Sequence, residues 1–287
     1  MHIAAQPGAF WLLAGALSEG RQWLGRGLDL APAPTPARIT ALWIDAVLAL
    51  YQHDLAAAIP RLQQCRSLAE QLADDKGRTF AVMTGGIAEL SSGHTGRGLA
   101  LMQAARTCQR QEGDLDAVAF NLYLAATSCA AGDPNTAAEL GRELLALCDV
   151  HGASLFGAYA QFLIGIVAWK GGHWQQAEKL VQQSAEPWIA INDHWGLAKA
   201  LEVLAWTAQA RHAHHRAARL LGAADRLWHE IGFSPTWLPY HTHSHQDCES
   251  GARQALGQRA FTIAFRRGAE LDLHTAVAYA ISHDDRQ

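Results

Sequence analysis

A pair of small residues, twelve positions apart, recurs along most of this chain. Both members of each pair are Gly or Ala, and successive pairs begin 38 to 40 residues apart. A side chain no larger than a methyl group on each of two crossing helices lets their axes approach to about 8–10 Å. The pattern therefore predicts six helical hairpins. The pairs are Gly8 with Gly20, Ala46 with Ala58, Gly86 with Gly98, Ala125 with Ala137, Gly165 with Ala177, and Ala205 with Ala217.

Each hairpin is expected to contain a first helix, a tight turn and a second helix. The turns carry residues that disfavour a continuous helix, such as Gly132-Asp133-Pro134, in which Asp can cap the next helix and Pro takes its first position. The first helices are expected at residues 3–14, 37–52, 77–92, 115–131, 154–171 and 194–211. The second helices are expected at residues 17–30, 55–73, 95–112, 134–150, 174–191 and 214–231.

The second small residue is followed, four positions later, by a large aliphatic residue in five of the six hairpins. Gly141 replaces it in the fourth hairpin, which we therefore expect to be packed more loosely. After Ile231 the 40-residue rhythm stops. Residues 233–239 are expected to form a loop, followed by short helices at 246–256, 258–267 and 273–282. Because a repeat array needs its last apolar face covered, we interpret residues 232–287 as a cap on repeats that occupy residues 1–231.

This frame resembles the tetratricopeptide repeat, whose usual unit is about 34 residues. The resemblance implies an all-α, right-handed superhelix of about six hairpins with a C-terminal helical cap. Two segments, Trp11–Leu24 and Ala217–Asp225, also resemble the repeat region of bacterial LuxR/MalT-like and AfsR/SARP-like transcriptional regulators. In those proteins an ATPase module precedes the repeats. This resemblance implies a regulatory array that senses an effector or a partner, but the family's ATP site and DNA-binding helices have no matching residues here.

In a tetratricopeptide-like frame, first-helix residues beside the small position line the concave face. These positions are rich in apolar and aromatic residues, which favours an apolar ligand or an amphipathic partner helix. The alternative is that the array closes tightly and these side chains form core. The candidate groove residues are Trp43, Val47, Met83, Ile87, Leu122, Phe162, Ile166, Trp169, Glu202 and Trp206.

Composition and charge limit which cellular compartment and which partners are expected. The chain carries a net charge of −4, so no broad basic face for nucleic acid is expected. Its five cysteines contain no CxxC pair, which indicates a reducing compartment. The start of the chain is not a convincing signal peptide, and the uncharged run 154–169 is short for a membrane span. We therefore expect a cytoplasmic protein.

The sequence carries no enzyme signature. Gly93–Gly98 resembles a phosphate-binding loop but lacks the Lys-Ser/Thr ending and a preceding strand. We therefore expect no catalytic residue and no cofactor. One alternative remains in His241, His243 and His245, because alternate residues of an extended segment point the same way and three imidazoles could bind Zn²⁺ or Ni²⁺. The competing interpretation is a polar surface link.

The sequence thus favours a non-catalytic sensor or protein-interaction scaffold of a transcriptional regulator. A ligand or partner in the groove would favour one curvature of the array and so act on an ATPase or DNA-binding module, in cis or in trans. The alternatives are a metal-dependent protein that uses the three histidines and an adaptor with no small ligand.

Overall fold

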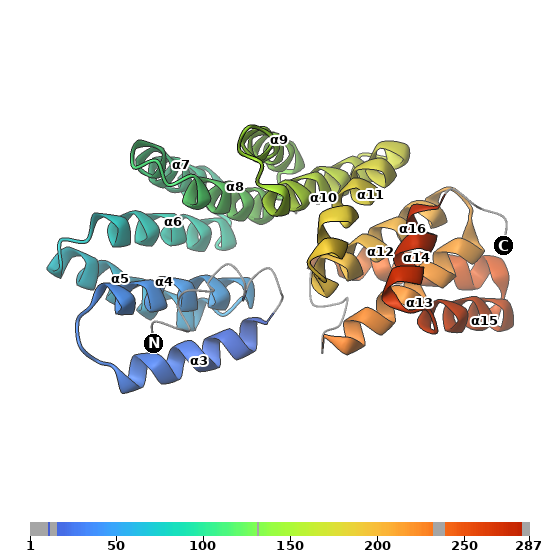
Figure 1. The fold of residues 1–287 in the computed structure, drawn as a ribbon, viewed down its shortest axis with the longest axis horizontal. Helices are drawn as coiled ribbons and strands as arrows, with labels where there is room; N and C mark the ends of the chain where they lie inside the picture. Colours follow the sequence, from blue (N-terminus) through green and yellow to red (C-terminus); the bar gives the residue numbers. More distant parts are fainter. Residues whose placement is uncertain (1–10, 12–15, 131, 232–238, 283–287) are drawn as a thin grey trace. The chain divides into compact units, whose positions relative to one another are not determined.

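The computed structural model describes residues 11, 16–130, 132–231 and 239–282, and all the elements in these ranges are helices (Figure 1). The helix expected at residues 3–14 lies outside them, apart from residue 11. The other eleven hairpin helices are present, with ends that differ from the expected ones by a few residues. They are α3 (Leu17–Leu30), α4 (Pro36–Tyr51), α5 (Leu55–Gln71), α6 (Asp75–Ser91), α7 (Thr95–Gln111), α8 (Leu115–Cys129), α9 (Pro134–His151), α10 (Ser154–Lys170), α11 (Trp174–Ala190), α12 (His194–Ala210) and α13 (His214–Glu230).

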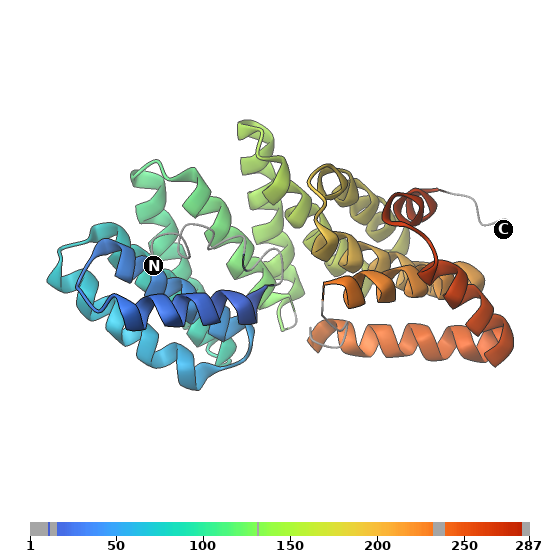
Figure 2. The same cartoon turned by 60° about the horizontal axis from the view of Figure 1, so that its bottom comes forward.

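The hairpin turns use a left-handed backbone conformation. The φ angle is +58° at His53, +84° at Gly93, +77° at Gly172 and +63° at His212, and each of these residues stands between the two helices of one hairpin (Figures 1 and 2). A left-handed residue just after a helix lets the next amide groups bond to the last carbonyls, which ends the helix in a defined direction. The turns therefore fix where each second helix begins.

The small residues lie where the two helices of a hairpin cross, as expected. A Cβ added to Gly86 would lie 2.9 Å from the carbonyl oxygen of Gly98, and a Cβ added to Gly98 would lie 2.8 Å from that of Gly86. A Cβ on Gly165 would lie 2.9 Å from Cγ2 of Val181. The Ala members of the other pairs are fully buried. They are Ala46, Ala58, Ala125, Ala137, Ala177, Ala205 and Ala217.

The chain divides into two compact units, residues 1–140 and 141–287. The boundary lies within α9, at Gly141, and not between the repeats and the C-terminal helices. Gly141 is the residue that replaces the large aliphatic side chain of the other hairpins. In the second unit, Ile164 of α10 occupies the space beside it, since a Cβ on Gly141 would lie 3.0 Å from Cγ1 of Ile164.

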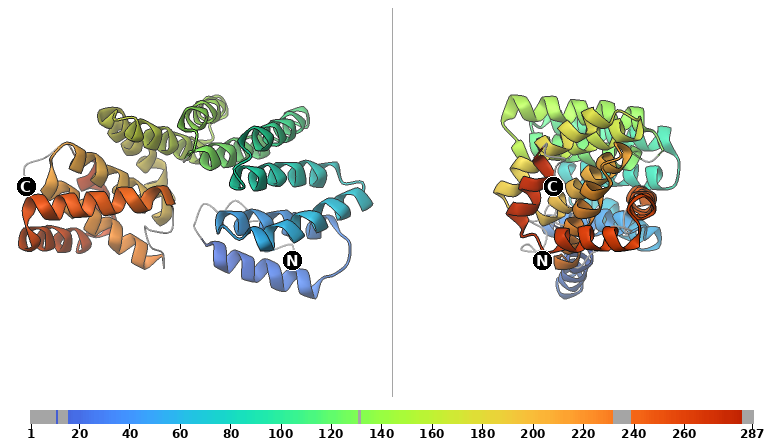
Figure 3. Two further views of the ribbon diagram at one scale, coloured as in Figure 1. Left: turned by 180° about the vertical axis from the view of Figure 1, so that it is seen from behind. Right: turned by 90° about the vertical axis from the view of Figure 1, so that its right-hand side faces the viewer.

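Three further helices follow α13 in the second unit. They are α14 (Pro239–Leu256), α15 (Gln258–Ala269) and α16 (Leu273–Ile281). Helix α14 packs against α12 and α13, α15 crosses α13, and α16 contacts α11, α12 and α13 (Figure 3). In these helices the side chains of Phe261 and Val277 are buried, whereas that of Ile263 is exposed.

The crossing of α13 and α15 is closer than that of the repeat hairpins. A Cβ on Gly222 would collide with the carbonyl oxygen of Phe265, and a Cβ on Gly268 would collide with that of Arg219. Main chain therefore touches main chain at this point. Within the described ranges, none of the helices has the length and apolar character needed to cross a bilayer.

Candidate functional site

The inner positions of the first unit are filled by aromatic side chains. The ring of Trp43 on α4 stacks on Phe80 of α6, with 4.4 Å between ring centroids, and meets Phe120 of α8 edge-on at 6.3 Å. The hydroxyl groups of Tyr51 on α4 and Thr127 on α8 are 2.6 Å apart and form a hydrogen bond. Contacts therefore run from α4 past α6 to α8, and the first helices of three hairpins are held together.

Most of the predicted groove residues lie in the interior. The buried ones are Val47, Met83, Ile87, Leu122, Phe162, Ile166, Glu202 and Trp206. Trp43 and Trp169 are half-buried. Within each unit these side chains pack as core, which is what the alternative interpretation expects, and an open groove stays a prediction. The physical reason is size, because large rings at these positions fill the space that smaller polar side chains would leave open.

The second unit has a charged amine in its interior. Lys199 of α12 is only 4% exposed, and its Nζ lies among the rings of four aromatic residues. The distances from Nζ to the ring centroids are 4.7 Å for Tyr159, 5.2 Å for Phe162, 5.5 Å for Trp195 and 5.8 Å for Trp188. A ring face attracts a cation within about 6 Å. We call these four residues and Lys199 the lysine cage.

The local sequence explains how the cage forms. Gly196 has no side chain, and a Cβ there would lie 2.5 Å from Cδ2 of Trp188, so glycine lets the indole lie against the start of α12. Asp193 caps that helix by accepting a hydrogen bond from the amide of Gly196 at 2.9 Å. Its other oxygen accepts a hydrogen bond from the hydroxyl of Tyr159 at 2.5 Å. The first turn of α12 thus positions the rings of Trp188 and Tyr159.

Burial changes the acid–base chemistry of the caged amine. Desolvation lowers the pKa of Lys199 from 10.5 to about 8, although the nearby negative charge of Asp193 acts in the opposite direction. An amine with a pKa near 8 is mostly protonated at neutral pH, so the cage holds a cation. A small fraction of this amine is neutral at that pH, whereas an exposed lysine is almost fully protonated.

Glu202 lies one turn further along α12, with its carboxylate fully buried. Two indole N–H groups donate to this carboxylate, from Trp206 at 3.1 Å and from Trp228 at 3.2 Å. The Nδ1 atom of His245, on α14, lies 3.0 Å from both carboxylate oxygens. A buried carboxylate is tolerated only when such donors surround it. We call Glu202, Trp206, Trp228 and His245 the glutamate cluster.

His245 joins α14 to the glutamate cluster. Burial opposes its protonation, but the hydrogen bond and charge of Glu202, with the charges of Glu249 and Asp225, raise the pKa of His245 above its ordinary value. The Nε2 atom of His245 is 3.9 Å from a carboxylate oxygen of Glu249. The imidazole therefore lies between two carboxylates that favour its protonated form, and it contributes to the docking of α14 on α12.

The proposed histidine metal site rests on an extended segment, and this expectation is wrong. Residues 239–256 form a helix, in which alternate residues do not point the same way as they do in an extended segment. The side chain of His243 is exposed, and that of His245 is turned to Glu202. The side chain of His241 lies outside the described residues. Among the side chains that are described, no three His, Cys, Asp or Glu residues gather as a metal site would require.

The arrangement is suited to binding. Burial raises the pKa of the Cys248 thiol well above its usual range, so this thiol beside the glutamate cluster stays protonated and is a poor nucleophile. The indole N–H of Trp188, in the cage, is buried without an acceptor among the described residues, as is that of Trp169. Trp169 packs on Trp206 at 5.1 Å. A cation, a carboxylate, indole donors and aromatic faces thus lie close together on α10 to α14.

Sequence reasoning named Phe162, Glu202 and Trp206 but missed the caged lysine. A signal was present, because Lys199 stands six positions before the small residue Ala205, where the corresponding residues of the other hairpins are His2, Thr40, Phe80, Ala119 and Tyr159. Lys199 has the only ammonium group among the residues at this repeat position, which distinguishes it from the core pattern. No protein-family model matches the chain, and the comparison with curated proteins finds no similar sequence.

Proposed function

We propose that this chain is the non-catalytic sensor region of a bacterial transcriptional regulator, with a tetratricopeptide-like scaffold that recognises an effector inside its second unit. The helical hairpins and the two segments that resemble such regulators, Trp11–Leu24 and Ala217–Asp225, support this role. The effector would act by favouring one conformation of the scaffold over another. An ATPase or DNA-binding module, in cis or in trans, would respond to that change.

The observation that carries the proposal is the buried pair of Lys199 and Glu202, one turn apart on α12. A core built only for stability gains nothing from an ionised amine among aromatic rings, because desolvation disfavours it. In a recognition site the same groups bind the acidic and polar groups of a ligand, while the rings contact its apolar part. The effector class that fits is therefore a small apolar or aromatic molecule with an acidic group.

Helix α14 has a defined part in this proposal. Because His245 closes over Glu202, an effector that reaches the carboxylate must displace the imidazole or bind beside it. Effector binding should therefore alter the protection of α14 amides against hydrogen exchange. This change gives a second readout that does not depend on overall stability.

A thermal-unfolding screen tests the proposal. The probes are indole-3-acetate, benzoate and octanoate, each paired with the alcohol of the same apolar part. A ligand at ten times its Kd stabilises the folded state by about 1.4 kcal/mol, which raises Tm by about 2 °C or more. We expect at least one acid, but not its alcohol, to raise the Tm of the wild-type chain and not that of Lys199→Met.

A different result would favour another role. If no acid raises Tm and α14 exchange is unchanged, the lysine cage is structural, and an adaptor without a small ligand becomes the better proposal. The regulatory assignment has its own test, because an ATPase module encoded in frame before Met1 would support it. An unrelated module there would contradict it.

A further inference from the structure

Arginines on α13 differ in whether the C-terminal helices supply acceptors for them. Arg216 donates to the carbonyl oxygen of Ala280 at 2.8 Å, and Arg226 donates to the carbonyl oxygen of Leu271 at 2.5 Å. Arg219, between them in sequence, has its guanidinium over the ring of Tyr279 at 4.3 Å. Its Nε–H is buried and has no acceptor among the described residues. A buried donor without an acceptor is unfavourable, so the described residues leave the hydrogen-bonding capacity of Arg219 incompletely used.

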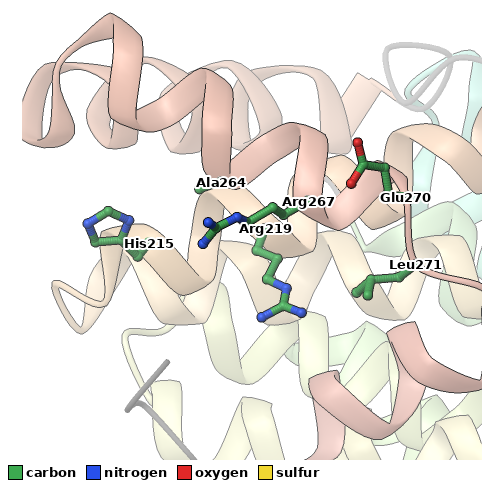
Figure 4. A pocket seen from close by; sticks show the side chains of 6 residues that line it. All are labelled: His215, Arg219, Ala264, Arg267, Glu270 and Leu271. Carbon is green, nitrogen blue, oxygen red and sulfur yellow. The ribbon is translucent and has the colours of Figure 1, made fainter.

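Arg219 borders a pocket of about 430 Å³ between α13 and α15 (Figure 4). Pockets of about 300–1,000 Å³ are typical of small-molecule sites. Figure 4 shows that Arg219 and Arg267 extend from two different helices at this pocket. The residues that line it are His215, Arg219, Ala264, Arg267, Glu270 and Leu271.

The charges around the pocket favour an anion. The residues that line it include two arginines and one histidine but a single acidic residue, Glu270. Arg267 is exposed, so its guanidinium can reach a ligand without first leaving the core. Arg219 is held in place by Tyr279 on one side, which reduces the side-chain entropy that it would lose on binding. Guanidinium groups match carboxylate and phosphate oxygens in pairs.

We propose that this pocket binds the oxyanion group of a small molecule, either a phosphate ester or a carboxylate. Arg267 would donate to its oxygens from α15, Arg219 would supply a second guanidinium group from α13, and His215 would contribute a third donor. Glu270 would weaken binding because its charge has the same sign as the ligand's. The site is separate from the lysine cage and the glutamate cluster, and it does not depend on the proposed effector.

Titration calorimetry on the full chain at constant ionic strength tests this inference, with inorganic phosphate and succinate as separate probes. We expect saturable binding of at least one probe, and the difference between them distinguishes a phosphate site from a carboxylate site. The Arg267→Gln variant should weaken binding at least tenfold, since charge-assisted hydrogen bonds contribute about 1.5–3 kcal/mol. The Glu270→Gln variant should strengthen it about two- to fivefold.

The matched control is Arg266→Gln, which removes the same charge from an exposed neighbour on α15 that does not line the pocket. It should change the affinity by less than about twofold. An equal loss in Arg266→Gln and Arg267→Gln would mean diffuse attraction to surface charge and would overturn the proposal. The absence of saturable binding of both probes would overturn it as well. Because Arg267 and Glu270 are both exposed, these variants are expected to fold normally.

Discussion

Lys199 is the residue whose chemistry departs most from its surroundings. Its pKa falls from 10.5 to about 8 because burial disfavours the charged form. A shift of this size corresponds to a cost of up to about 3 kcal/mol in the free energy of folding at neutral pH. Cation–π attraction to the four rings offsets part of that cost. The amine therefore lowers the stability of the second unit at neutral pH.

We predict that Lys199→Met raises the free energy of unfolding by about 1–3 kcal/mol at pH 7, as measured by urea denaturation. Between pH 8 and 10.5 the wild-type chain should gain stability relative to the variant. In that range the unfolded lysine still binds a proton that the folded one has released. The control is Lys179→Met on the exposed face of α11, with a change below about 0.5 kcal/mol. A less stable Lys199→Met would show that the rings stabilise the cation more than burial disfavours it.

His245 gives the opposite pH dependence. The folded state binds its proton more tightly than the unfolded state does, because Glu202, Glu249 and Asp225 outweigh the effect of burial and raise the pKa. Its contribution to stability is therefore complete below the unfolded pKa of about 6.5 and is lost as the pH rises through the folded pKa. We predict that His245→Gln removes this pH-dependent part, on the order of 1 kcal/mol.

The measurement is the difference in unfolding free energy between wild type and variant from pH 5 to pH 9. His243→Gln is the matched control, since His243 is exposed on the same helix. A pH profile that is the same for the wild type and His245→Gln would show that the imidazole does not contribute to the docking of α14 through its charge.

At the scale of elements, the crossing of α13 and α15 depends on two glycines. Gly222→Ala or Gly268→Ala would place a methyl group against a carbonyl carbon or oxygen of the facing helix. Backbone cannot move aside as a flexible side chain can, so we predict a loss of at least 3 kcal/mol for either substitution. Separation of α15 from α13 should be visible as faster hydrogen exchange in α15.

Gly96→Ala is the control for this pair. Gly96 is exposed within α7, and a Cβ there would meet nothing within 4 Å. The same substitution should therefore stabilise the helix by about 0.5–1 kcal/mol, because alanine has the higher helix propensity. If Gly268→Ala were tolerated as well as Gly96→Ala, the close main-chain crossing would be wrong.

The sequence predicted the helices and turns of the hairpins but missed the start of α14. The turns at His53 and His212 have no glycine. They were still predicted, because the spacing of the small residues does not depend on which residue occupies the turn. The start of α14 at Pro239 was missed because its first residues are polar. Its buried face consists of the small residues Ser244, Cys248 and Ala252, which give a weak periodic signal.

The site was harder to predict for a related reason. Periodicity assigns Trp43 and Phe162 to inner positions, but it does not say how closely one hairpin packs on the next. That distance depends on the shapes of particular side chains, such as the stacking of Trp43 on Phe80. The structure was therefore needed to show that these residues are interior. It was also needed to bring His245 to Glu202, because 43 residues separate them.

At the scale of the molecule, the two compact units have different interiors. The inner positions of the first unit hold stacked aromatic rings and a neutral hydrogen bond between hydroxyl groups. Those of the second unit hold an ammonium, a carboxylate and an imidazole among indole rings. The lysine cage and the glutamate cluster therefore both belong to the second unit, residues 141–287.

The hydrogen bond between Tyr51 and Thr127 determines how the first unit can respond to a mechanical load. It connects residues 76 positions apart in the sequence and spans the hairpin between them. A repeat array without such a connection extends like a spring, since each hairpin contacts only its neighbours. With α4 tied to α8, the first unit should instead transmit a pull as one stiff body until this bond and the stacked rings break together.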